Sequence, residues 1–397
     1  MNENISPRGK KHADDLIDRY LVPLFQEIDS FAQTPYVQSL ENECVFLGGG
    51  SPSMLSERQL ELFLTKVSDS FDLSRVQEYS MEFELRTMTE EKLKICRDHG
   101  ITRISFGWQT FVPHIRKIMA LTPTEDELRE KIELLRKYDF SINADLMFGM
   151  PEQTFDDWKN DVARALEFGY TGVDLFKTEN VPPAPMYILS QTKNWSFLDS
   201  ETKKDMFCYA IEEFERHGYI QDSFQRMYHP DHPTSRLLYN KKRALAAYDQ
   251  VSFGPGSWGF IADRVYVNDI SIDNYISQGD AGVSGGHIGC KQKITPQEYV
   301  ERNFVQGLSH NMKLVKADVV GDIPEQYLEV LEKLKSHGLL EEDDKEYRLT
   351  KDANGYVFNV AHEFFSKESK RKSIVFFMQQ RHGRKGKKRE QKVEMNI

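Results

Sequence analysis

Between residues 44 and 176 the sequence alternates five times between short apolar runs and amphipathic helical patterns. The apolar runs suit buried strands, and the segments between them repeat apolar residues at helical spacing. Strands are predicted at Cys44–Leu47, Val76–Phe83, Ile101–Trp108, Ser141–Gly149 and Gly172–Phe176. Helices are predicted at Glu57–Val67, Thr89–His99, Thr124–Tyr138 and Phe155–Phe168, after an amphipathic helix at Asp14–Ala32. This alternation is typical of βαβ units, so the chain is predicted to build a parallel α/β sheet.

Three consecutive glycines follow the first predicted strand. Gly48, Gly49 and Gly50 lead into Ser51 and a proline, after which a polar helical segment begins. Because glycine has no Cβ, a ligand can lie directly against the backbone N–H groups of such a turn. Three glycines can equally form a simple tight turn, so the interpretation depends on the residues nearby.

Polar side chains stand at or near the carboxyl ends of the next three strands. They are Glu82, Gln109 and Asp145. In α/β barrels and open α/β sheets, ligands bind at this edge. Each residue alone is compatible with an ordinary polar strand end, but their coincidence predicts one binding site.

The composition sets broad limits. At 397 residues and 39% hydrophobic content, the chain can bury a large core and is expected to form one big domain and a smaller one. No run of eighteen apolar residues exists and the amino end is polar, which predicts a cytoplasmic protein. The four cysteines, Cys44, Cys96, Cys208 and Cys290, match neither a metal-binding spacing nor a disulfide framework.

The net charge of −10 is unevenly distributed. The segment from Lys367 to Ile397 carries +8, so residues 1–366 carry −18. An acidic body argues against a duplex-binding surface, because phosphate contacts need dense positive charge. The basic stretch from Arg381 to Lys392 could touch nucleic acid or acidic lipid, but a disordered extension is the favoured interpretation.

The second half of the chain carries weaker signals. Gly254, Gly256 and Gly259 have a dinucleotide-binding spacing, but they come late and lead toward a strand-like segment rather than a helix. His229 and His232 could offer a metal two imidazoles, although the flanking prolines favour a surface turn. From Thr295 on, helical patterns followed by a short hairpin predict a winged-helix-like unit, for which the acidic composition favours a packing role over DNA binding.

Five motifs in order resemble the radical S-adenosylmethionine (SAM) enzymes related to oxygen-independent coproporphyrinogen III oxidase. The matching segments are 48–53, Met81–Glu82, Arg103–Phe111, Asn143–Thr154 and Phe253–Gly256, and the resemblance covers residues 40 to 350 or so. It implies a partial parallel (β/α)6-type barrel lacking its first strand. The expected domains are the barrel at 1–290, the winged-helix-like domain at 291–365 and a basic, disordered tail at 366–397.

The resemblance also implies ligands and roles. The triplet Gly48–Gly50, with Ser51 beside it, would receive the SAM amino group together with Glu82. Gln109 and Asp145 would hold the ribose, while Met147 and the loop of Gly254 and Gly256 would border the adenine. The implied cofactors are SAM and a [4Fe-4S] cluster, and the implied substrate is a tetrapyrrole or a similar small molecule.

The sequence departs from the family pattern in three ways, and the first concerns its amino end. The family holds its cluster through three closely spaced cysteines upstream of the glycine triplet, whereas residues 1–43 contain no cysteine. The first barrel strand is also missing, which would leave an unpaired sheet edge. A truncated amino terminus is favoured over a degenerate member without radical chemistry.

The second departure is Leu121, where the family places an arginine for the SAM carboxylate; Arg116, Lys117 and Arg129 are candidate substitutes. The third is the absence of the His-Asn-x-x-Tyr-Trp signature of the heme chaperones, since the corresponding region, 235–240, reads Ser-Arg-Leu-Leu-Tyr-Asn. This favours the heme-utilisation or methyltransferase-like branches. The alternatives to an enzyme are a non-catalytic SAM- or tetrapyrrole-binding protein and a winged-helix regulator acting through the basic tail.

Overall fold

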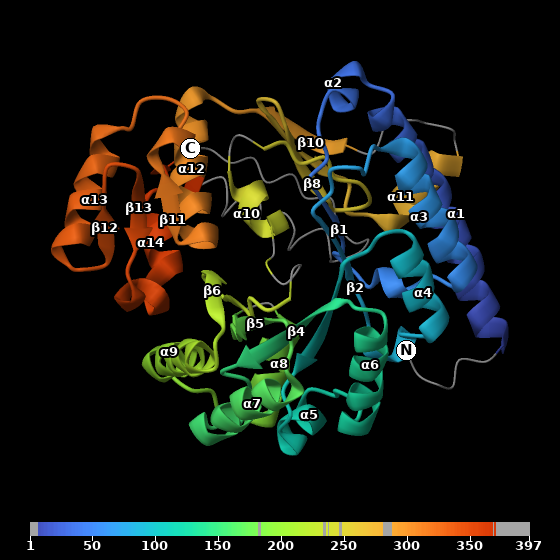
Figure 1. The fold of residues 1–397 in the computed structure, drawn as a ribbon, viewed down its shortest axis with the longest axis horizontal. Coiled ribbons are helices and arrows are strands. Elements are labelled where there is room, and N and C mark those ends of the chain that lie inside the picture. The colour runs from blue at the N-terminus through green and yellow to red at the C-terminus, as the bar shows by residue number, and fades with distance from the viewer. Residues whose placement is uncertain are drawn as a thin grey trace.

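The computed structural model in Figure 1 describes residues 7–181, 184–232, 236, 238–245, 248–280, 288–367 and 369–370. The predicted tail at 366–397 therefore falls outside the described residues from 371 onward. Part of the region at 235–240 also lies outside them.

A seven-stranded sheet forms the centre of the larger part of the molecule. Its order is β1-β2-β3-β4-β5-β7-β6, with β1 to β5 parallel and β7 and β6 antiparallel. The strands are β1 (Cys44–Leu47), β2 (Glu78–Glu82), β3 (Arg103–Gln109), β4 (Ser141–Phe148), β5 (Gly172–Lys177), β6 (Ile220–Ser223) and β7 (Arg226–Tyr228). The sheet curls into an open half-barrel (Figure 1), which confirms the predicted α/β class and its partial barrel. All five predicted strands are present.

Helices cover the convex face of the half-barrel. They include α3 (Glu57–Ser70), α4 (Glu90–Asp98), α6 (Glu125–Lys137), α7 (Phe155–Phe168) and α9 (Ser200–Arg216). Three of them begin with a capping box, at Ser56, Thr124 and Thr154, and α7 ends at the left-handed Gly169. The outward-facing apolar residues of the strands pack with these helices into one large core.

The concave face of the sheet is polar, which the apolar strand patterns did not predict. Because side chains alternate along a strand, the residues that share this face are Glu78, Ser80 and Glu82 on β2, Arg103 on β3, Asn143 and Asp145 on β4, Asp174 on β5 and Arg226 on β7. Most of them are buried. The strands of this sheet therefore pack apolar side chains against the helices on the convex face and place charged side chains on the concave face.

Strand β1 ends the sheet on the side where the missing barrel strand was expected. Helix α10 (Leu238–Ala244) lies against it: the rings of Phe46 and Tyr239 stack with centroids 4.8 Å apart, and the backbone N–H of Tyr239 donates to Glu78. This helix was not predicted. Helix α10 therefore covers part of the sheet edge formed by β1.

A second group of elements joins the amino end to the late glycine loop. Helix α1 (Pro7–Ala32) packs on α3 and on α11 (Ile272–Asp280), next to an antiparallel sheet in the order β10-β9-β8. Its strands are β8 (Trp258–Ile261), β9 (Arg264–Asn268) and β10 (Ile288–Lys293). The Gly254 loop leads into β8, so it does not open a helix as a dinucleotide fingerprint would.

The carboxyl-terminal elements have a hydrophobic core of their own. They are α12 (Pro296–Asn311), β11 (Lys313–Val315), α13 (Glu325–Ser336), β12 (Leu340–Glu342), β13 (Glu346–Leu349) and α14 (Val357–Glu363), and their sheet order is β11-β13-β12. The helices and the hairpin follow the predicted order, while the winged-helix assignment and the three domain boundaries stay predictions. The remaining α-helices of the described residues are the short α2 (Pro35–Gln38), α5 (Pro113–Ile118) and α8 (Pro185–Lys193). None of the helices in the described ranges is long and apolar enough to cross a membrane.

Candidate functional site

The predicted ligand-binding residues lie along the carboxyl edge of the parallel strands. The triplet Gly48–Gly50 follows β1, Glu82 ends β2 and Gln109 ends β3. Asp145 stands on β4 directly beside Gly107 of β3. Parallel pairing thus brings these residues, which are spread over about a hundred positions of sequence, to one edge.

Glu82 and the glycine triplet are in direct contact. The N–H of Gly49 donates to Glu82 Oε2 at 3.2 Å. A Cβ at Gly48 would lie 2.7 Å from the carboxyl carbon of Glu82, so only glycine leaves room for this side chain. Gly49 has a φ of +84°, and beside Gly49 and Gly50 a Cβ would meet only open space. The turn therefore presents bare backbone beside a carboxylate.

Gln109 uses a second glycine in the same way. It has a left-handed φ of +73° and follows a register shift between Gly107 and Gln109. Its side chain folds back over Gly107 so closely that a Cβ at position 107 would overlap the Gln109 amide nitrogen. Gly107 is exposed in the middle of the sheet. The amide therefore lies on the concave face, next to the strand that carries Asp145.

Burial raises the pKa values of both site carboxyls. The pKa of Asp145 stands well above its usual range, because the group is desolvated and Asp174 lies nearby. Arg226 is committed to Asp174, to which it donates through Nε at 2.6 Å and through a second nitrogen. Burial likewise raises the pKa of Glu82, although the hydrogen bond from Gly49 opposes the shift. A cationic ligand at this edge would stabilise both carboxylates.

The remaining predicted residues occupy two places. Ser51 precedes a short 3₁₀ turn and is exposed, and Met147 lies two residues beyond Asp145 on the concave side of β4. Gly254 and Gly256, both with positive φ, lie in the loop before β8. The Gly254 N–H donates to Glu27 of α1 at 2.9 Å, and that of Gly256 to Asp269 at 3.1 Å. The structure thus ties the late loop to α1 and β9, whereas the other predicted residues gather at the sheet edge.

The candidate substitutes for the family arginine have other partners. Arg116 donates to the carbonyl oxygens of Trp108 and Thr110 at 3.2 and 2.7 Å, and its guanidinium lies 3.9 Å from the Trp108 ring centre. Arg129 pairs with Glu125 on α6. Lys117 is exposed on α5. Arg116 and Arg129 are therefore occupied by the protein's own groups.

The residues present do not fit an iron–sulfur cluster. The four cysteines lie on four separate elements, namely β1, α4, α9 and β10. Within the described ranges, no three His, Cys, Asp or Glu side chains gather as metal ligands. The open backbone at Gly49 and Gly50 beside Glu82, by contrast, is compatible with a small polar ligand that carries a cationic group.

Two buried anchors of the site were missed by the sequence analysis. Ser53 accepts hydrogen bonds from the Glu84 N–H and the Thr87 hydroxyl, and its carbonyl accepts one from Lys92. Asp161 of α7 is fully buried beneath the turn after β3. The available signal was a carboxylate on the apolar face of a helix, between Trp158 and Val162.

Comparisons with known proteins identify a domain and a fold. Residues 32–165 match the Radical SAM superfamily. The half-barrel resembles the solved structure of coproporphyrinogen III oxidase (HemN) from Escherichia coli, with a TM-score of 0.75 and 21% identity over 90% of this chain and 84% of that one. The chain therefore contains a radical SAM domain and has the radical SAM half-barrel fold.

Two relatives are similar to large parts of this chain. The heme chaperone HemW of Lactococcus lactis is 28% identical over 265 residues, which are 66% of this chain and 66% of that protein. The oxygen-independent coproporphyrinogen III oxidase of Bradyrhizobium diazoefficiens is 23% identical over 366 residues, 88% of this chain and 80% of that one. The protein is thus a homologue of HemW and of this oxidase, and the relationship to the oxidase is the one that the motifs predicted. At these identities the likeness supports the oxidase and chaperone relationships alike.

Proposed function

We propose that this protein binds SAM at the carboxyl edge of the half-barrel. The observation that carries the proposal is the pairing of Glu82 with the open glycine turn: a half-buried carboxylate lies against Gly48 and accepts from the Gly49 N–H. SAM carries an ammonium, a sulfonium and a ribose diol. A carboxylate suits the ammonium, bare backbone suits close approach, and side-chain oxygens suit the hydroxyls.

The residues would divide this work by position. Glu82 and Gly48–Gly50 would bind the amino end of the ligand, and Gln109 and Asp145 would hold the ribose. Met147 is assigned to the adenine side, together with the loop of Gly254 and Gly256. The raised pKa values of Glu82 and Asp145 favour this assignment, because a positive ligand replaces the solvation that burial removes.

We further propose that the protein acts on a tetrapyrrole or a similar substrate in the cytoplasm, as an oxidoreductase or methyltransferase-like member of the superfamily. The support is the kinship with coproporphyrinogen oxidases and heme chaperones. Because the cysteines present do not fit a cluster, no radical step is assigned to this chain's own residues.

The second candidate is a non-catalytic protein that retains the SAM site. The separation of the four cysteines onto four elements favours this candidate. Anaerobic incubation with iron, sulfide, a reductant and SAM distinguishes the two. Release of 5′-deoxyadenosine would support the enzyme, whereas SAM binding without release would support the binding protein.

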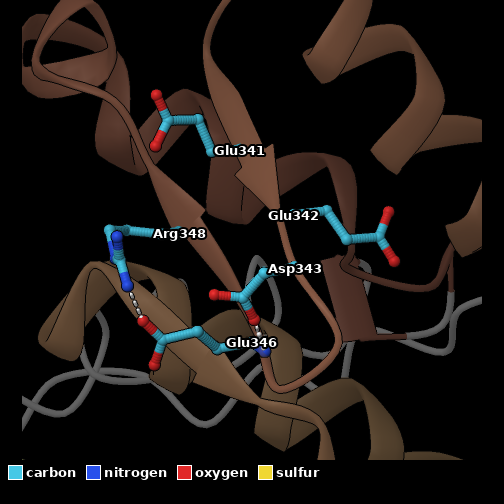
Figure 2. A pocket seen from close by; sticks show the side chains of 5 residues that line it. All are labelled: Glu341, Glu342, Asp343, Glu346 and Arg348. Atoms are coloured by element: carbon cyan, nitrogen blue, oxygen red, sulfur yellow. Dashed lines mark hydrogen bonds and ion pairs between the residues drawn. The ribbon is translucent and has the colours of Figure 1, made fainter.

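A nucleic-acid-binding role is disfavoured by the carboxyl-terminal hairpin. Figure 2 shows its carboxylates Glu341, Glu342, Asp343 and Glu346, of which Glu346 is paired with Arg348. A phosphate backbone would be repelled by this hairpin, and the nearby Lys313, Lys316 and Lys335 are already paired with its acidic residues.

Calorimetry with SAM tests the proposed site. The unmodified protein should bind SAM, and Glu82→Ala and Asp145→Ala should each weaken binding by about tenfold or more, as expected for the loss of a charged hydrogen-bond partner. Glu341→Ala, on the exposed hairpin, is the matched carboxylate control and should leave Kd unchanged. Unchanged affinity in both site variants would show that the pocket has been misassigned.

A further inference from the structure

We propose that Asp161 is a positioning residue for Gln109: with Arg116 it clamps the turn after β3 so that the Gln109 amide lies on the concave face. The inference rests on the proposed SAM site, where Gln109 is assigned to the ribose. It adds to that site a buried residue that does not touch the ligand.

The turn needs a clamp because Gln109 is strained. A non-glycine residue with φ of +73° stands in the left-handed region, which costs free energy and persists only where surrounding contacts hold it. The ladder with β4 shifts register at the same point. If β3 continued as a regular strand, the Gln109 side chain would lie further along the concave face, because successive side chains of a strand alternate between faces. The left-handed turn instead folds its amide back over Gly107.

Asp161 holds the residues that immediately follow Gln109. Its carboxylate accepts from the Thr110 hydroxyl at 2.8 and 3.0 Å and from the Phe111 N–H at 2.6 Å. The side chain is completely buried, so water cannot replace these bonds. Charge-assisted bonds in a dry environment are strong and directional, which suits a group that fixes one backbone conformation.

Arg116 holds the same turn through its backbone carbonyl groups. It donates to the carbonyl oxygens of Trp108 and Thr110, the residues on both sides of Gln109, and also to Pro123. Asp161 thus binds the N–H and hydroxyl groups of the turn while Arg116 binds its carbonyls. The two side chains therefore fix the backbone on both sides of Gln109, whose own side chain lies over Gly107 on the concave face.

Asp161 also links this turn to the next one. Gln153, in the loop after β4, donates to Asp161 at 3.2 Å and accepts from the Met150 N–H at 3.1 Å. That loop begins just after Met147. One buried carboxylate therefore ties together the carboxyl ends of β3 and β4, which carry Gln109 and Asp145.

A double-mutant cycle tests the inference by SAM calorimetry. Gln109→Ala and Asp161→Asn should each weaken binding by about tenfold, and the double variant should bind no more weakly than either single one, because Asp161 acts through Gln109. In the control cycle, Asp161→Asn and Glu82→Gln should have effects that multiply, since Glu82 belongs to β2. Multiplying effects in the Gln109 cycle would overturn the proposal.

A second measurement separates this inference from the proposed function. Hydrogen exchange of the ligand-free protein should become at least about tenfold faster at the Phe111 and Val112 amides in Asp161→Asn, while α3 stays protected. Thr110→Val removes one donor to Asp161 and should show a smaller increase at the Phe111 amide, so the test does not depend on Asp161→Asn folding well. Only Phe111 is compared in this variant, because the Thr110 hydroxyl is itself the acceptor of the Val112 N–H. Unchanged exchange in both variants would refute the clamp even if SAM binds. Failure of the unmodified protein to bind SAM would refute the proposed site instead.

Discussion

The two carboxyl groups of the candidate site, Glu82 and Asp145, have pKa values that suit the binding of a positively charged ligand. Glu82 and Asp145 are carboxyls whose pKa values burial raises, although the guanidinium of Arg226 on β7 opposes the shift at Asp145. That guanidinium is bound to Asp174. A carboxyl whose ionised form is desolvated lowers the stability of the folded protein, and such a cost is typical of binding sites.

The first prediction follows from these pKa values. SAM binding should release protons, because a cation beside Glu82 and Asp145 lowers their raised pKa values, and affinity should fall as the pH drops through them. Without ligand the sign is opposite for stability: the folded state binds these protons more tightly than the unfolded chain, so stability should fall as pH rises through the same interval. Calorimetry in buffers of different ionisation enthalpy measures the release, and Glu82→Gln and Asp145→Asn should each reduce it. Equal release in all three proteins would contradict the assignment.

At the scale of elements, the site depends on how strands end. Strand β1 ends in three glycines, and β3 ends in a register shift over Gly107. In both cases a missing Cβ leaves the space that a polar side chain from the same edge occupies. The strand ends are therefore shaped for neighbouring side chains as well as for a ligand.

Gly107→Ala is predicted to separate binding from folding. The new methyl group would displace the flexible Gln109 amide, so stability should change by less than about 1 kcal/mol while SAM affinity falls by about tenfold. In a Gln109→Ala background the same substitution should have no further effect on affinity. Gly100→Ala is the control: at φ of +82° with open space around it, it should cost about 1 kcal/mol of stability and leave SAM binding intact. Chemical denaturation and calorimetry measure the two effects, and a normal Kd for Gly107→Ala would contradict the expected displacement.

At the scale of the whole molecule, buried polar residues join segments that lie far apart in the sequence. Glu27 of α1 accepts from the Gly254 N–H at 2.9 Å, from Asn268 at 2.6 Å and from the Tyr275 hydroxyl at 2.7 Å. These partners lie more than two hundred residues away. Helix α10 has a similar role toward the carboxyl-terminal elements, since it contacts both β1 and α12 (Figure 1).

Removing the Glu27 carboxylate should loosen this connection. Glu27→Ala removes the acceptor of the Gly254 N–H and one acceptor each of Asn268 and Tyr275. It should lower the free energy of unfolding by about 2–4 kcal/mol, with Glu27→Gln recovering part of the loss. The exposed pair of Glu41 and Arg75 provides the control, because Glu41→Ala should cost no more than about 0.5 kcal/mol. Urea unfolding measures both. A Glu27→Ala protein as stable as the control would show that the connection rests on apolar packing alone.

Much of the fold could be predicted because it is encoded locally. Helix α7 was predicted at its observed bounds, since Thr154 and Gly169 mark its ends in the sequence itself. The β7–β6 hairpin and α10 were missed, because short segments such as Arg226–Tyr228 have no clear periodicity and acquire their conformation from the sheet and helices around them.

The amino-acid sequence by itself determined the order of strands and helices and placed Glu82, Gln109 and Asp145 at strand ends, because periodicity and glycine position act over a few residues. Only the tertiary structure decided which buried polar groups meet. Asp161 binds a turn fifty residues away, Arg116 is taken up by backbone carbonyls, and Glu27 reaches a loop near the other end of the chain. Such pairings depend on how the strands and helices assemble in space, so no local pattern specifies them.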